Sequence, residues 1–252
     1  MTAALRAEVR KLLTTQVCFW LALLGLGLSV LIACLVSGFS KVTDGGAPLD
    51  GALNAAIGFS SLIAAVLGVI GLTGEYRHLT ATPTFLAVPR RGRVVGAKLV
   101  THVIAGLLLG VLCVGASLAV AAPWLDSKGF PIDLGSDSTR RIILGGILSV
   151  AIFGVIGVGV GALLRNQVAA VVGIVIYLFV AEPILSAIPG VQKAYPYLPG
   201  GASSAMTTSS DPNQQNPNVD LLEPWQGGLL LLGYGLAFAI LGSLLTVRRD
   251  VT

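Results

Sequence analysis

Charged side chains are scarce in this sequence. Asp, Glu, Lys and Arg make up 11% of its 252 residues, and 54% of the residues are hydrophobic, whereas an ordinary soluble domain carries about 25% charged residues. Such a composition is typical of a chain that lies in lipid. The basic residues flank apolar runs and do not line one polar face, which argues against nucleic acid as a partner.

Motifs that hold nucleotides or perform hydrolysis are also missing. No Gly-Lys pair occurs, so the chain has no phosphate loop of the form G-x-x-x-x-G-K-[ST], and it has no H-E-x-x-H or G-x-S-x-G motif. The two histidines, His78 and His102, and the three cysteines show no metal-ligand spacing. We therefore expect no enzyme activity and no bound cofactor or metal in this chain, so any active transport needs energy from elsewhere.

Six long stretches are nearly free of charge. A helix needs about 20 apolar residues to cross a hydrocarbon core of about 30 Å, and each stretch reaches that length, the fifth by tolerating Glu182. Runs this continuous favour helices over the alternating strands of a membrane barrel. The predicted fold is an all-α integral membrane protein, one transmembrane domain over residues 1–252, with helices at 17–37, 53–73, 98–121, 142–164, 168–188 and 225–247.

Lys and Arg predict the orientation of these helices. If the N-terminus is cytoplasmic, eleven of the sixteen basic residues fall on the inner side and five on the outer side. Both termini are then cytoplasmic. The first apolar run is longer than the 7–15 residues of a signal peptide's apolar region, so we expect it to be retained. Residues 5–16 place apolar and basic residues on opposite helical faces, which predicts an amphipathic helix on the cytoplasmic leaflet, unless they are only a topology anchor.

The loop predicted at 74–97 concentrates positive charge between the second and third helices. Thr82 followed by Pro83 is typical of a helix start, which predicts a short helix that ends at Val88. This helix would expose Phe85 and Leu86 beside arginines, and exposed apolar residues of this kind usually meet a partner. The alternative is a solvated basic loop whose apolar residues rest on the bilayer surface.

Polar residues within the apolar runs are candidates for a translocation path. Glu182 would lie about 21 Å from the inner end of its helix at 1.5 Å per residue, and a charge at that depth indicates function, unless Glu182 is protonated or pairs with Arg140 or Arg141. The other candidates are Asn54, Ser60, Ser61 and Tyr177. The outer segment 189–224 combines a Tyr/Pro cluster, typical of an interfacial or re-entrant element, with a polar loop.

Small residues four apart offer close contact between helices. They are Gly106 with Gly110 and Gly157 with Gly161. Pairs of this spacing serve packing either within one chain or at a dimer seam.

Several motifs together resemble the permease subunits of bacterial type-2 ATP-binding cassette exporters. They are E-x-R-x-x-T from Glu75, F-L-A-V-P-R-R at 85–91, G-A-K-L at 96–99, E-V-R-K-L-L-T-T-Q-V at 8–17 and Y-L-P-G-G-A at 197–202. With the six predicted helices, the resemblance covers nearly the whole chain.

The resemblance implies a function and partners. Loop 74–97 would carry a coupling helix that docks in a groove of a separate ATPase subunit, present in two copies with its own ATP and magnesium. A second permease chain, identical or a paralogue, would complete the path in the bacterial cytoplasmic membrane, for a lipophilic or amphiphilic cargo such as a drug, a peptide or a lipid-linked molecule. The coupling residues would be Glu75, Arg77, Thr82, Pro83, Phe85, Leu86, Val88, Arg90, Arg91 and Arg93.

Two other functions stay open. A secondary transporter or channel would use Glu182 as an intramembrane charge and would not need ATP. A membrane scaffold that transports nothing would use the same helices and the basic loop for contact alone, and it would leave the ATP turnover of a partner unchanged.

Overall fold

A computed structural model of the chain describes residues 2–41, 47–77, 91–164, 166–188, 191–208 and 221–248. Within these ranges every regular element is a helix. Six helical segments are long and apolar enough to cross a membrane: Gln16–Phe39, Pro48–Glu75, Val95–Ser127, Asp137–Leu164, Gln167–Ala187 and Pro224–Gly242. For the described residues, this confirms the prediction of an all-helical fold with six helical segments long and apolar enough to span a membrane.

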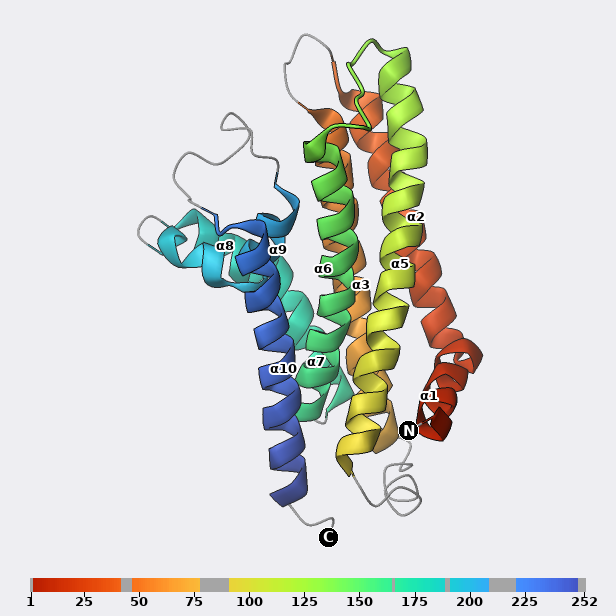
Figure 1. Cartoon of the computed structure of the whole chain (residues 1–252), viewed down its shortest axis with the longest axis vertical. Helices are drawn as coiled ribbons and strands as arrows, with labels where there is room; N and C mark the ends of the chain where they lie inside the picture. The colour runs from red at the N-terminus through yellow and green to blue at the C-terminus, as the bar shows by residue number, and fades with distance from the viewer. Residues whose placement is uncertain are drawn as a thin grey trace.

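The elements follow one another along a single bundle (Figure 1). Their bounds are α1 Thr2–Thr14, α2 Gln16–Phe39, α3 Pro48–Arg77, α5 Arg91–Ser127, α6 Asp137–Leu164, α7 Gln167–Ile176, the π-helical turn η2 Tyr177–Ala181, α8 Glu182–Ala187, the 3-10 helix η3 Gln192–Tyr197, α9 Pro199–Thr207 and α10 Pro224–Arg248. Figure 1 shows α1, the start of α5 and the last turns of α10 at the same end of the bundle, called the α1 end below.

α3 and α5 extend into the segment predicted as loop 74–97. α3 continues to Arg77 and α5 begins at Arg91, because no Pro interrupts either stretch, and a helix does not have to stop where its apolar run stops. Glu75 and Arg77 therefore lie on α3, while Arg91 and Arg93 lie in the first turn of α5.

α6 is the central helix of the bundle. It packs against α3, α5 and α10, and most of its middle residues are buried. Glycines make this packing close: a Cβ on Gly157 would overlap the carbonyl oxygen of Ala65 on α3, and a Cβ on Gly106 of α5 would lie 2.7 Å from the Cα of Ala151 on α6. Membrane helices associate through small residues of this kind. Both glycine pairs singled out in the sequence therefore serve packing within the chain.

The amphipathic helix predicted at 5–16 is found as α1, over Thr2–Thr14. It ends where Thr15 takes an extended conformation, with φ −84° and ψ 112°, and α2 begins at the next residue. α1 packs against α5 and touches α2, so it lies against the α1 end of the bundle instead of continuing the first span (Figure 1).

The segment predicted as outer loop 189–224 contains two helices, η3 and α9. α9 packs against α10 and α6, and it lies in the half of the bundle away from α1 (Figure 1). Opposite it, the fifth span is interrupted by η2, which ends directly before Glu182. Pro183 has no N–H to donate one turn back, so the helix cannot keep regular α hydrogen bonds here, and the wider turn re-aims the residues that follow.

Candidate functional site

A buried lysine lies at the centre of a charge cluster at the α1 end. Lys98 on α5 is 0% exposed. Its ammonium donates to Glu8 Oε2 at 2.8 Å and to the Gly71 carbonyl at 2.9 Å, and its Nζ lies 2.9 Å from Glu75 Oε1. An ammonium has three N–H donors, and three acceptors surround this one. The burial of this charge is therefore compensated, which a buried ion requires.

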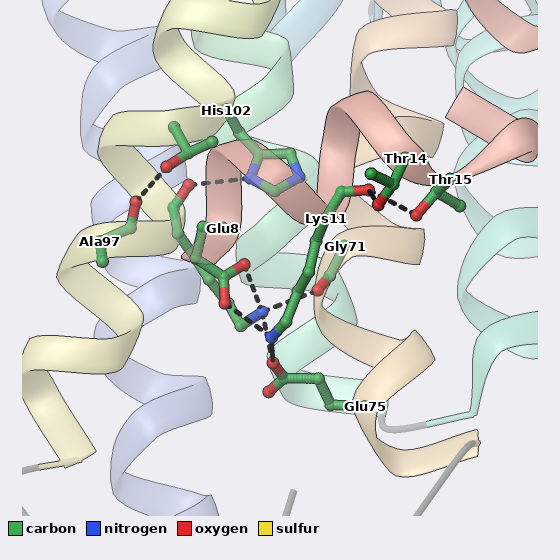
Figure 2. Close-up of polar contacts among 10 residues, drawn as sticks. Glu8, Lys11, Thr14, Thr15, Gly71, Glu75, Ala97 and His102 are labelled. Carbon is green, nitrogen blue, oxygen red and sulfur yellow. Dashed lines mark hydrogen bonds and ion pairs between the residues drawn. The ribbon is translucent and has the colours of Figure 1, made fainter. Parts of the chain in front are cut away.

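Lys11 completes the cluster from the solvent side. Its Nζ lies 2.9 Å from Glu8 Oε1 and 2.6 Å from Glu75 Oε1, and about half of its side chain is exposed. Figure 2 shows Glu8 and Lys11 of α1 meeting Glu75 of α3. Two carboxylates and two ammonium groups balance in charge. We call Glu8, Lys11, Glu75 and Lys98 the α1 cluster.

Gly71 serves the cluster in two ways. Its carbonyl accepts a hydrogen bond from Lys98, and its missing side chain makes room for His102, whose ring a Cβ on Gly71 would overlap. His102 is 2% exposed, and its Nδ1 lies 2.8 Å from the Lys98 carbonyl (Figure 2). The same residue of α3 therefore allows close packing against α5 and provides an acceptor for Lys98.

The α1 cluster joins three elements that are far apart in sequence. Glu8 and Lys11 come from α1, Glu75 from the last turn of α3 and Lys98 from the second turn of α5. α3 and α5 are the two helices that residues 78–90 connect. The base of this connection is therefore held to the amphipathic helix by buried ion pairs.

The cluster predicts a pH window for stability. Burial favours a higher pKa for Glu8, but the charges and hydrogen bonds of Lys98 and Lys11 outweigh it and lower the pKa below 4.5. Burial favours a lower pKa for Lys11, but its hydrogen bonds to Glu75 and Glu8 raise the pKa above 10.5. The lowered carboxyl pKa contributes stability that is lost as pH falls through its folded value, and the raised amine pKa contributes stability that is lost as pH rises through its own.

We therefore expect the Tm of the detergent-solubilised protein to be highest between about pH 4.5 and pH 10.5 and to fall on either side. Circular dichroism melts of the wild type and of Glu8→Gln test this. The variant is expected to show a lower Tm and a weaker acid dependence. An acid limb of equal steepness in both proteins would contradict the assignment.

A cavity of about 530 Å³ lies between α3, the η2–α8 segment and α9. We call it the α9 cavity. Aromatic and aliphatic side chains form part of its wall, and its polar wall includes Asn54, Ser61, Glu182, Ser203, Ser204 and Thr207. Ser61 is 3% exposed, and its hydroxyl has no hydrogen-bond partner among the described residues.

Glu182 caps the N-terminus of α9. Its Oε1 accepts hydrogen bonds from the backbone N–H groups of Gly200, at 2.6 Å, and Gly201, at 3.1 Å. These are among the first N–H groups of α9, which have no partner inside the helix, and a carboxylate is favourable there. A Cβ on Gly200 would lie 2.6 Å from Oε1, so the glycine permits the approach. The Y-L-P-G-G-A motif thus includes the binding site for this acid.

The predicted path residues separate into three groups. Asn54, Ser61 and Glu182 share the α9 cavity. Tyr177 instead lines a second, mostly apolar cavity of about 460 Å³ between α6, α7 and α10. Ser60 is fully buried and donates to the Ala56 carbonyl one turn back. The sequence had left open whether Glu182 pairs with Arg140 or Arg141. In the structure, the carboxylate of Glu182 accepts hydrogen bonds from backbone N–H groups of α9.

The predicted coupling residues are only partly described. Glu75 is buried in the α1 cluster, and exposed Arg77 lies at the end of α3, with its guanidinium 3.5 Å from the side-chain oxygen of Gln167. Arg91 and Arg93 belong to α5, but their side chains lie outside the described part of the chain. The positions from Thr82 to Arg90, with Pro83, Phe85, Leu86 and Val88, lie outside the described residues altogether.

Glu8, Lys11 and Lys98 are the site residues that sequence reasoning missed. A signal was present, because Lys98 interrupts an apolar run and therefore needs a counter-ion in a membrane protein. Glu75, at the end of the preceding span, was the nearest available acid.

No protein-family model matches this sequence, and no curated protein matches it. The resemblance to type-2 exporters therefore stays a prediction that rests on the residues alone.

Proposed function

We propose that the chain is the membrane-spanning permease subunit of an ATP-driven exporter in the bacterial cytoplasmic membrane. It would act with two copies of a separate ATPase subunit and with a second permease chain. The observation that carries this proposal is the α1 cluster, which ties α1, α3 and α5 together at the base of residues 78–90.

A docking segment needs a stiff base if it is to transmit force. When a partner pushes on residues 78–90, flexible attachment would dissipate the movement, whereas buried ion pairs pass it to both flanking helices. Lys98 is fully buried among its three acceptors, so separating these elements would leave an uncompensated charge, which is costly. α3 and α5 would then follow the ATPase as rigid bodies between inward and outward access.

The α9 cavity supports a translocation path, because α3 also reaches this cavity at a distance from the α1 cluster. α3 contributes Glu75 to the α1 cluster near its last turn, and Asn54 and Ser61 to the cavity. A movement of α3 at the α1 end would therefore change the shape of the cavity. The mixture of polar and aromatic side chains in its wall suits an amphiphilic cargo.

A secondary transporter is the second candidate, because Glu182 lines the cavity as an intramembrane acid. Its Oε1 is engaged by α9, which gives the acid a structural task that a proton-carrying residue would have to interrupt. Transport without an ATPase would favour this candidate. A scaffold function would leave the cavity without a use.

The test is a pull-down of the solubilised protein from its native cells. We expect an ATPase subunit to co-purify with the wild type and to be lost with the double variant Phe85→Asp and Leu86→Asp, because two carboxylates would not enter an apolar groove. Leu134→Asp is the matched control, since Leu134 is an exposed leucine in the connection between α5 and α6, at the opposite end. Equal recovery of the ATPase with all three proteins would overturn the docking role, and its absence from all three would overturn the exporter function.

A further inference from the structure

The charges around the α9 cavity have one sign. Glu182 lines it, and no Lys, Arg or His is among the described residues that do so. An anionic group in this cavity would face a carboxylate without a counter-charge, whereas a cation would find one.

Glu182 keeps acceptor capacity for a ligand. Both N–H groups of α9 bond Oε1, and no donor within the described part of the chain is assigned to Oε2. The side chain is 3% exposed and fixed by α9, so its position is set before a ligand arrives. A prearranged acceptor loses little entropy on binding.

Ser61 supplies a second polar contact. Its hydroxyl is buried without a partner among the described residues, and the residue lines the cavity. Buried hydroxyls are nearly always hydrogen-bonded, so the Ser61 hydroxyl is available for a hydrogen bond to a ligand. It accepts as well as donates, which suits an N–H group. Its neighbour Ser60 is satisfied within its own helix and lies off the cavity.

Aromatic rings provide the apolar part of the wall. Phe59 of α3 and Phe179 of η2 meet with their ring centroids 5.3 Å apart, and both line the cavity. Phe179 is also 45% exposed on the surface of a membrane-spanning segment. The aromatic wall thus continues toward the lipid, where a hydrocarbon chain gains from apolar contact, and the ring faces attract a cation.

We propose that the α9 cavity binds a cationic amphiphile, with its protonated amine against Glu182 and Ser61 and its hydrocarbon part along Phe59 and Phe179. As a statement about cargo, this rests on the exporter function proposed above. As a binding site, it stands independently of any ATPase.

The test measures binding to the full chain in phosphatidylcholine nanodiscs. The probe is a decyl chain with a dansyl group at one end and a primary amine at the other; two matched probes carry an acetamide or a carboxylate instead. Dansyl fluorescence, corrected with empty nanodiscs, gives each Kd. We expect the amine to bind about tenfold more tightly than the acetamide, or about 1.4 kcal/mol, because it adds a charge-assisted hydrogen bond to Glu182, and the carboxylate to bind most weakly.

Variants separate the charge from the fold. Glu182→Gln keeps a side-chain oxygen for the two N–H groups of α9 and is expected to abolish the preference for the amine. Ser61→Ala is expected to weaken amine binding, while Ser60→Ala is the matched control and leaves it unchanged. A carboxylate probe that binds the wild type as tightly as the amine would overturn the proposal even if the variants failed to fold. Selectivity retained in Glu182→Gln would overturn it as well.

A further arm identifies the source of the amine. If the occupant is a bilayer lipid with an amino head group, phosphatidylethanolamine added to the nanodiscs competes with the amine probe. If the occupant is a free amphiphile, the added lipid leaves probe binding unchanged. Both results presuppose that the wild type prefers the amine probe. The binding assay contains no ATP, so its result does not depend on the exporter function. If the nanodiscs show no preference for the amine but the pull-down still recovers an ATPase, only the cationic cargo is ruled out. Selectivity without any ATPase would leave the site standing and remove the exporter.

Discussion

Replacing Lys98 with Met is expected to lower the free energy of unfolding by about 3–5 kcal/mol, the usual cost of removing one partner from a buried ion pair. The methionine fills a similar volume but takes one ammonium group away from Glu8 and Glu75, both of which still contact Lys11. Two carboxylates 7% and 8% exposed at the side chain would then share one half-exposed ammonium. Thermal and urea unfolding of the solubilised protein, followed by circular dichroism, measures the loss.

Two controls make this result specific. Lys193→Met removes an exposed positive charge from η3 and should change stability by less than about 0.5 kcal/mol. Adding Glu75→Gln to Lys98→Met leaves Glu8 facing Lys11, so the double variant should be less destabilised than the sum of the two single variants. Additive effects, or a Lys98→Met protein as stable as the wild type, would show that the α1 cluster does not hold the helices together.

Gly157→Leu is expected to destabilise the protein by about 3 kcal/mol, the upper part of the usual range for overpacking. A Cβ at this position would already overlap the Ala65 carbonyl, and a backbone atom cannot turn aside as a flexible side chain can. α3 and α6 would have to separate along their shared face, and contacts in the rest of the central packing would be lost. Gly157→Ala should show a smaller loss in the same direction.

The matched control is Gly233→Leu on α10. Gly233 is exposed and has no atom within 4 Å of a would-be Cβ, so a leucine there meets open space, and its higher helix propensity is favourable. Thermal stability measured by size-exclusion chromatography after heating compares the three proteins. Equal losses from Gly157→Leu and Gly233→Leu would mean that the small residues of α6 do not determine the packing.

The number of membrane-spanning helices could be predicted from the sequence because lipid imposes a length and a composition on each span. The ends of α3 and α5 could not be predicted in this way. Their helices continue past the apolar runs, where hydropathy carries no information, and packing against α1 through Glu8, Glu75 and Lys98 supports the extra turns.

The candidate site was only partly accessible to sequence reasoning, because adjacent polar residues on a helix point about 100° apart. The sequence does not distinguish Ser60 from Ser61 as a residue of the translocation path, yet of these two only Ser61 lines the α9 cavity. Glu182 drew attention as an intramembrane charge, but its bonds to Gly200 and Gly201 depend on the π-helical turn and on α9, two features that hydropathy does not reveal.

Photo-crosslinking in living native cells tests ATPase docking directly, with a benzoylphenylalanine at position 85 and, as the matched control, at position 134. The covalent adducts are purified in denaturant and identified by mass spectrometry, so no complex has to survive detergent. We expect position 85 to capture a protein with a nucleotide-binding phosphate loop and position 134 not to capture it. The same adducts at both positions, or a position 85 that captures only lipid, would contradict the assignment of residues 78–90 as an ATPase docking segment.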